Sequence, residues 1–160
     1  EQMSSTLTEM LDSIDIDILR ALQTDARLST RQLATKVHRS PTPVFERLKR
    51  LEAQGYISRY VAVLDADKLG RGFVVFCQVK LRHINRDIAS GFVSLVKSLP
   101  EVTECYNVSG AFDYLLKIYA PSMADYRDFV LNKLGAFDFI GAIESTFVMS
   151  EIKREYAIPL

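Results

Sequence analysis

The sequence has few cysteines and no long apolar run, and both absences exclude classes of protein. Cys77 and Cys105 are the only cysteines, and neither a CxxC spacing nor a nearby histidine accompanies them, so we expect no metal site and no disulfide framework. No stretch reaches the roughly eighteen apolar residues that cross a bilayer, and residues 1–10 lack the basic-then-apolar pattern of a secretory signal. We therefore expect a cytoplasmic protein with reduced thiols and no membrane partner.

The sequence also lacks net charge, yet its charges are unevenly distributed. The 20 basic and 20 acidic side chains cancel over the whole chain. Residues 26–60 nevertheless carry eight basic and two acidic side chains, whereas residues 1–25 carry one basic and six acidic side chains. Phosphate binding depends on the potential within a Debye length, about 8–10 Å, rather than on the total charge. A basic patch in residues 26–60 therefore keeps nucleic acid among the expected partners.

Apolar residues recur at helical spacing in the first sixty positions and predict three helices. The first covers residues 11–22 and has acidic residues in its first turn, where they suit the positive end of the helix dipole. Ser29 is expected to cap a short second helix, and Ser40 with Pro41 to begin a third helix that ends at Gly55. Because only a few residues join the second and third helices, we expect a helix-turn-helix unit.

A second domain is indicated by a change of apolar period from about 3.6 to 2 after Ile57. A strand over residues 57–64 is expected as a hinge, followed by a turn at Gly70 and Gly72. The elements expected next are a strand at 73–82, a helix at 86–98, strands at 101–108 and 113–119, a helix at 122–135 and a strand at 141–152.

This βαββαβ order predicts a ferredoxin-like domain, an antiparallel sheet with both helices on one face. The expected fold class is α+β, with a helix-turn-helix domain at residues 1–60, a hinge at 61–70 and a second domain at 71–160.

The uncovered face of such a sheet indicates a partner. Apolar strand residues give both faces of the predicted sheet apolar character: Val75, Cys77, Val79, Tyr114, Leu116, Ile118, Phe147 and Met149. An exposed apolar sheet in a folded protein usually marks an interface, and the most economical partner is a second copy of the chain. We therefore expect a homodimer.

The candidate DNA contacts lie on the side of the third helix opposite its apolar stripe and in the segment that precedes this helix. A recognition helix presents its N-terminal residues to base edges in the major groove, while further basic residues contact phosphates. The candidate residues are Arg31, Lys36, Arg39, Ser40, Thr42, Pro43, Glu46, Arg47, Lys49 and Arg50. Alternatively, these charges form a solvated helix face. Phe45 and Tyr60 are expected to pack rather than to contact bases. A dimer predicts double-stranded DNA with an imperfectly palindromic operator.

The turn at residues 108–114 is the second candidate site. Gly110 permits a positive φ and exposes backbone N–H groups that suit an α-carboxylate, while Asp113 suits an α-ammonium group. These features fit a small zwitterion. The alternative is a plain β-hairpin turn, which is common between strands.

Three segments resemble the leucine-responsive regulator/AsnC (Lrp/AsnC) family of bacterial and archaeal transcription factors. They read LDSIDIDILRALQTDARLSTRQLA, SPTPVFERLKRLEAQGYISRY and VSGAFDYLLKI. The resemblance extends from Leu11 to Glu155 in the family's domain order and is closest to the leucine-responsive branch. It implies a winged helix-turn-helix domain and a RAM-type ligand-sensing domain. Ala111 stands where an acidic residue is frequent in the family, so the identity of the effector does not follow from the resemblance.

The resemblance also implies an effector and an assembly. In similar proteins an amino acid binds beside the glycine loop at the junction between dimers, and the final strand contributes to the site. The implied effector residues are Val108, Gly110, Asp113, Tyr114, Ser145, Thr146 and Phe147. A homodimer that assembles to an octamer or a similar oligomer is expected.

An enzyme is the main alternative to a regulator, because related domains occur in haem-pathway decarboxylation and a fold does not settle a function. The two histidines, His38 and His83, lie in different predicted domains, and no GxSxG, HExxH or phosphate-loop pattern is present. An amino-acid-binding adaptor without DNA binding is a third possibility, and the basic residues at 26–60 argue against it. We expect a transcriptional regulator that is not an enzyme and has no cofactor.

Overall fold

The computed structural model of the chain describes residues 11–160, which form two compact units. One unit comprises the described residues up to Val63 together with residues 153–160, and the other comprises residues 64–152. None of the helices in this part of the chain is both long and apolar enough to cross a membrane. The expectation that residues 1–10 carry no secretory signal lies outside the described residues.

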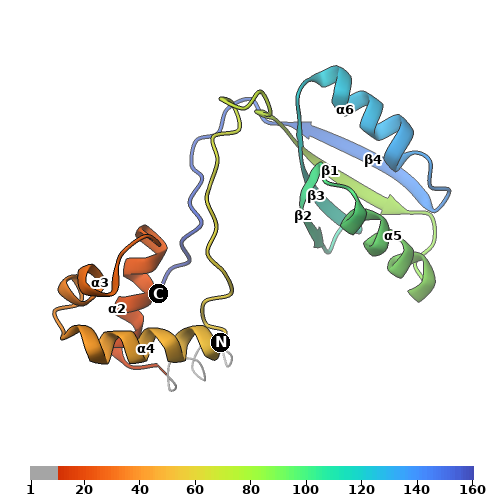
Figure 1. Ribbon diagram of the computed structural model, residues 1–160. Helices are drawn as coiled ribbons and strands as arrows, with labels where there is room; N and C mark the ends of the chain where they lie inside the picture. Colours follow the sequence, from red (N-terminus) through yellow and green to blue (C-terminus); the bar gives the residue numbers. More distant parts are fainter. Residues whose placement is uncertain (1–10) are drawn as a thin grey trace. The chain divides into compact units, whose positions relative to one another are not determined.

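The described part of the first unit contains three helices (Figure 1): α2 (Ser13–Thr24), α3 (Thr30–Lys36) and α4 (Pro41–Ala53). Ser29 caps α3 as predicted, because its side chain accepts a hydrogen bond from the backbone N–H of Gln32. Ser40 occupies the N-cap position of α4, but its hydroxyl makes no capping hydrogen bond within residues 11–160, so Pro41 defines the start of this helix. The turn from α3 to α4 is tight and passes through His38 with a φ of 54°.

The three helices pack around one apolar core, which confirms the predicted helix-turn-helix. Its buried members are Ile18, Leu19, Leu22, Leu33, Ala34, Val44 and Leu51. Burying each of the larger side chains contributes about 1.5–3 kcal/mol relative to leaving it exposed, which fixes α4 against the other two helices.

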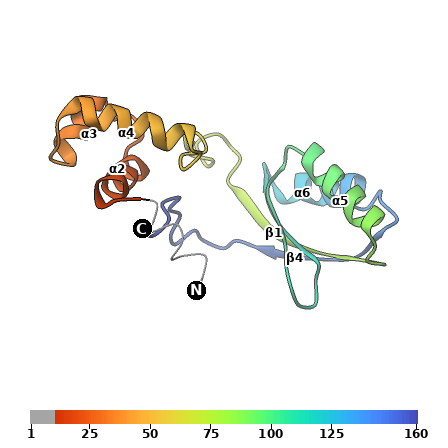
Figure 2. The same cartoon turned by 90° about the horizontal axis from the view of Figure 1, so that it is seen from below.

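The second unit has the predicted βαββαβ order. It consists of β1 (Phe73–Leu81), α5 (Arg86–Ser98), β2 (Val102–Asn107), β3 (Tyr114–Ala120), α6 (Met123–Phe129) with the π-helical turn η1 (Val130–Leu134), and β4 (Ile140–Phe147). The strands lie in the order β2-β3-β1-β4 and every neighbouring pair is antiparallel. Figure 2 shows α5 and α6 on one side of the sheet. The fold is therefore ferredoxin-like.

The apolar strand residues lie mostly on one face of the sheet. Val75, Cys77, Val79, Tyr114, Leu116 and Ile118 are all buried in the core of the second unit. Phe147 pairs with Val75 on the same face, and Met149 lies beyond β4. The uncovered face carries the alternate residues, among them half-buried Phe76 and Leu115 beside Lys117. The uncovered face is therefore a mixture of apolar and charged residues, because side chains alternate between the two faces along each strand.

The strand predicted at residues 57–64 is wrong. This segment pairs with no other strand among the described residues, and the side chains of Val61 and Val63 are 63% and 56% exposed. An extended segment needs a neighbour to hydrogen-bond with before it becomes part of a sheet, and the apolar pattern alone does not supply one.

Two predicted ends also differ from the structure. The final strand ends at Phe147 rather than at residue 152, and Met149 beyond it is 95% exposed. The helix from Ser122 finishes in η1, and Gly135 has a φ of −69° instead of the left-handed conformation expected of a glycine cap.

Residues 153–160 were predicted to belong to the second domain, and in the structure they pack with the first unit. The side-chain amide of Gln23 on α2 bonds to Ile158 in both directions, donating to its carbonyl (3.0 Å) and accepting from its N–H (2.6 Å). The Arg20 guanidinium donates to the carbonyl of Leu160. The chain therefore returns to α2 after completing the sheet.

We predict that Gly55→Ala lowers the free energy of unfolding of the first unit by about 1–2 kcal/mol, because a side chain disfavours the left-handed conformation. Gly55 has a φ of 78°, and a Cβ there would meet no atom within 4 Å, so the loss comes from the backbone alone. Gly91→Ala within α5 is the control, and alanine should add about 0.5–1 kcal/mol there. Urea unfolding followed by circular dichroism measures both changes. A Gly55→Ala protein as stable as the parent would contradict the prediction.

Candidate functional site

The end of α3 and the start of α4 bring together much of the predicted DNA-contacting set. Arg31, Lys36 and Arg39 are exposed and form no ion pair with any residue between 11 and 160. The Arg39 guanidinium donates only to the neighbouring carbonyl of His38 (2.9 Å). Ser40, Thr42 and Pro43 are exposed beside these residues. This surface is positively charged and presents the first turn of α4.

The outer side of α4 continues this surface. At about 100° of rotation per residue, Thr42, Glu46 and Lys49 lie opposite the buried Val44 and Leu51. All three outer residues are exposed, so their side chains are accessible to a ligand.

Further along α4, side chains on its outer flank bond to one another. The ammonium group of Lys49 pairs with Glu52 (3.2 Å) and lies 5.6 Å from the centre of the Phe45 ring. The Tyr60 hydroxyl donates to the other oxygen of Glu52 (2.9 Å). Burial, together with this bond, raises the pKa of Tyr60 to about 12. Tyr60 is thus held by α4 through its hydroxyl, while 48% of the residue stays exposed and it lies outside the apolar core.

Arg47 and Arg50 are engaged within the chain. Nη1 of Arg47 donates to Asp12 Oδ2 (2.6 Å) and to Asp15 Oδ1 (2.9 Å), and Nη2 of Arg50 donates to Asp15 Oδ2. The backbone N–H of Asp15 and the Arg47 guanidinium hold the pKa of Asp12 below its usual range. Bonds to Asp12 and Asp15 raise the pKa of Arg47.

From the sequence, Asp12 and Asp15 were expected only to interact favourably with the dipole of the first helix. Their pairing with Arg47 and Arg50 of α4 was not predicted. The available signal was an acidic pair three residues apart in α2 and a basic pair three residues apart in α4. Direct DNA contacts by any of the ten predicted residues stay predictions.

The loop between β2 and β3 is anchored at the end of β1. Gly110 has the positive φ expected of it, 117°. The Asp113 carboxylate accepts from the N–H of Leu81 through Oδ2 (2.7 Å), and its backbone N–H donates to the carbonyl of Val79 (2.9 Å). The N–H of Val108 donates to the carbonyl of Asp113 (2.9 Å). Oδ1 of Asp113 receives no hydrogen bond from residues 11–160 and stays available to a ligand.

The other predicted effector residues do not gather at this loop within one chain. Tyr114 is buried, with its ring 4.4 Å from that of Phe92. Ser145 bonds to the hydroxyl of Tyr126 on α6 (2.6 Å), and the Phe147 ring packs 5.8 Å from the Tyr126 ring. Thr146 pairs with Phe76 in the middle of β1. The β4 residues that pair with the end of β1 are instead Ile140, Ala142 and Ile143.

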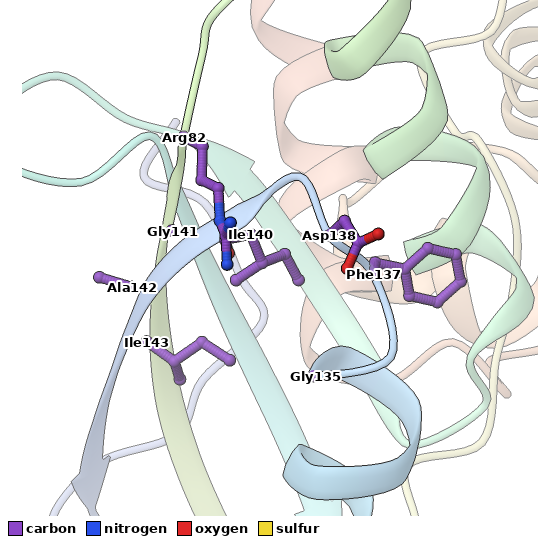
Figure 3. Close-up of a pocket in the computed structure, with 8 residues that line it drawn as sticks. All are labelled: Arg82, Gly135, Phe137, Asp138, Ile140, Gly141, Ala142 and Ile143. Atoms are coloured by element: carbon purple, nitrogen blue, oxygen red, sulfur yellow. The ribbon is translucent and has the colours of Figure 1, made fainter.

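An open hollow of about 250 Å³ lies on the β4 side of the end of β1 (Figure 3). Its lining consists of Arg82, Gly135, Phe137, Asp138, Ile140, Gly141, Ala142 and Ile143. The side chain of Arg82 runs beside Ile140 and donates to its carbonyl through Nε (3.2 Å). Asp113 contacts the same end of β1 from the β3 side.

The hollow was not predicted, because its residues come from three separate segments without a common motif. Across the described part of the chain, no three histidine, cysteine, aspartate or glutamate side chains form a group that could hold a metal ion.

Comparisons with known proteins agree with this architecture. Residues 11–58 match the model of a winged helix-turn-helix DNA-binding domain, and residues 74–158 match that of the Lrp/AsnC ligand binding domain. The chain is 40% identical to the leucine-responsive regulatory protein of Escherichia coli K12 over 90% of its own length and 88% of that protein. It is 35% identical to the transcriptional regulator AzlB of Bacillus subtilis over 94% and 96% of the two chains.

Solved structures show the same likeness. A transcriptional regulator of Neisseria meningitidis, crystallised as an L-Met complex, has a TM-score of 0.90 and 35% identity, covering 93% of this chain and 96% of that one. An AsnC family transcriptional regulator of Agrobacterium tumefaciens has a TM-score of 0.89 and 35% identity, with coverage of 93% and 97%. The chain therefore belongs to the Lrp/AsnC family of transcriptional regulators, with an N-terminal DNA-binding helix-turn-helix domain and a C-terminal ligand-binding domain.

Proposed function

We propose that this regulator reads an imperfectly palindromic operator as a homo-oligomer, and that a small amino acid changes its assembly and DNA binding. We propose that it has no catalytic activity of its own. Such a protein acts in the compartment that holds the DNA, the cytoplasm of a bacterial or archaeal cell. The observation that carries the proposal is the set of exposed cations around the start of α4 that form no ion pair within residues 11–160.

The proposed DNA interface consists of a phosphate-binding part and a base-reading part. Arg31, Lys36 and Arg39 are exposed and carry no carboxylate partner among residues 11–160, so they suit phosphate contacts that position the protein. Thr42 and Glu46 face outward from the first turns of α4, the part of a recognition helix that approaches base edges.

Salt dependence tests the proposed phosphate contacts. The probe is a duplex enriched by the parent protein from a random-sequence pool. We expect Lys36→Gln to make the negative slope of log K against log salt shallower by about 0.9, because one counterion fewer is released from the DNA. Lys97→Gln on α5 removes the same charge from the second unit and should leave the slope unchanged. Equal slopes for the parent and Lys36→Gln would remove Lys36 from the interface.

The proposed effector site centres on Asp113. Its free Oδ1 suits an α-ammonium group, and the N–H groups around Gly110 suit a carboxylate. The Neisseria meningitidis relative, crystallised with L-Met, supports an amino acid as the ligand. Because Ser145, Thr146 and Phe147 do not reach this loop within one chain, their predicted role requires a neighbouring subunit.

A thermal-shift screen against the twenty amino acids tests the effector. A ligand at a hundredfold excess over its Kd stabilises the folded protein by about 2.7 kcal/mol. Asp113→Asn keeps an oxygen that can accept from Leu81 but removes the negative charge, so it should abolish the shift and preserve DNA binding. Asp138→Asn at the hollow is the matched control and should retain the shift. A shift that persists in Asp113→Asn and disappears in Asp138→Asn would move the effector site to the hollow.

The uncovered sheet face is the proposed dimer interface. Half-buried Phe76, Leu115 and Tyr119 give it an apolar centre, and Lys117 pairs there with Glu104 (3.3 Å). A two-fold axis brings the same surface of two subunits into contact, so a second copy of the chain can bury this apolar centre. Further assembly to an octamer or a similar oligomer is the proposed step on which the effector acts, since a ligand shifts an equilibrium by its differential affinity for the two states.

A further inference from the structure

We infer that Asp15 positions the recognition helix α4 for DNA reading, and that Arg47 supports DNA binding through its bond to Asp15 rather than by touching the DNA. The inference rests on the DNA binding assigned to the helix-turn-helix domain and concerns how α4 is held. It separates Arg47 from the exposed cations Arg31, Lys36 and Arg39.

Asp15 is an unusual residue within the first unit. Its side chain is 1% exposed, and no other charged or polar residue in the described part of the chain is buried. A buried carboxylate is costly unless its oxygens are bonded. Both oxygens of Asp15 are bonded to α4, Oδ1 to Arg47 and Oδ2 to Arg50. Both ion pairs that stabilise this charge therefore come from the recognition helix.

Arg47 is committed to this contact. Its Nη1 is shared between Asp15 and Asp12, and its side chain is 27% exposed. At about 100° per residue it lies on the flank of α4, between the buried Val44 and the outward-facing Glu46. A phosphate would have to bind Nη2 or Nε of a guanidinium whose Nη1 already donates to two carboxylates, which neutralise its charge.

The network also connects α4 to the first turn of α2. The Asp12 side chain caps α2 by accepting from the N–H of Asp15 (2.9 Å), and the Asp15 side chain accepts in return from the N–H of Asp12 (3.3 Å). The two carboxylates that receive Arg47 are thus held by the start of α2. A shift of α4 along or around its axis breaks these bonds, so the network fixes the angle at which α4 presents Thr42 and Glu46.

The test compares Arg47→Gln and Asp15→Asn with Arg39→Gln. The last variant removes the same positive charge as Arg47→Gln, from a residue that pairs with no carboxylate between residues 11 and 160. Each variant is titrated over a range of salt concentrations with two duplexes, one enriched by the parent protein from a random pool and one of random sequence. Circular dichroism confirms that each variant is folded at the assay temperature.

A misplaced α4 should harm base reading more than phosphate binding. We expect Arg47→Gln and Asp15→Asn to weaken binding to the enriched duplex about tenfold, a factor that corresponds to roughly 1.4 kcal/mol. Their affinity for the random duplex and their salt slopes should match the parent. Arg39→Gln should weaken binding to both duplexes by the same factor, and its negative slope of log K against log salt should be shallower by about 0.9. The double variant of Arg47 and Asp15 should bind no more weakly than either single variant.

The opposite pattern overturns the inference. In that pattern, Arg47→Gln makes the negative salt slope shallower by about 0.9 and weakens binding to both duplexes by the same factor, as loss of a phosphate contact does. Asp15→Asn would bind as tightly as the parent, or more tightly because a negative charge near DNA has been removed.

Two further outcomes can be distinguished from a failure of the inference: a variant that does not fold, and a parent protein that does not bind DNA. Should Asp15→Asn fail to fold, Asp12→Ser takes its place, since serine keeps an N-cap side chain but takes one carboxylate from Arg47. It should also weaken only the enriched duplex. Arg47→Gln, which breaks the bond to Asp15 itself, then decides the inference, and parent-like binding of the enriched duplex by this variant would overturn it. A parent protein that enriches no duplex contradicts DNA binding itself, not the role of Asp15.

Discussion

The buried carboxylate of Asp15 is the constraint on which the DNA-reading half of this protein depends. It lies at the start of α2, its own helix, and receives guanidinium groups from the middle of α4. Removing one of its two guanidinium partners leaves this buried charge with a single partner, which destabilises the unit because a buried carboxylate needs both of its oxygens bonded. The described part of this unit has three helices and seven buried apolar side chains, so its free energy of unfolding is small and the loss of one ion pair is a large fraction of it. The helices are therefore held in one arrangement by charge as well as by apolar packing.

This arrangement divides the basic residues into two groups with different physical roles. Arg47 and Arg50 neutralise carboxylates of α2 and so contribute little field toward solvent. Arg31, Lys36 and Arg39 face solvent without an acidic partner in the described residues, and their field acts over a Debye length. The net charge of a segment overstates the potential that DNA meets when part of that charge is paired internally.

In the second unit, the order and register of the strands determine which residues lie near the glycine loop. Because β1 lies between β3 and β4, its end is contacted by Asp113 from one side and bordered by the Arg82 hollow on the other. The same register places Ser145 and Phe147 against α6, away from the glycine loop. The proposed ligand site, if it combines Ser145 or Phe147 with the glycine loop, would therefore have to be shared between two chains, and effector binding would then be linked to assembly.

Local patterns in the sequence were sufficient for the elements with short-range causes. The capped start of α3, the proline at the start of α4, the glycine turn at Gly110 and the βαββαβ order all follow from spacing and turn chemistry within a few residues. The strand expected near Val61 failed for the converse reason, since strand formation depends on a partner that local apolar spacing does not specify.

The sequence by itself thus determined the helix-turn-helix, the ferredoxin-like order of the second unit and the family. Only the tertiary structure decided which arginines are paired, which face of the sheet is covered and that residues 153–160 return to α2. Each of these depends on contacts between residues far apart in the chain. Such contacts follow from how the helices and strands pack, and the apolar periodicity of a single helix or strand does not specify them.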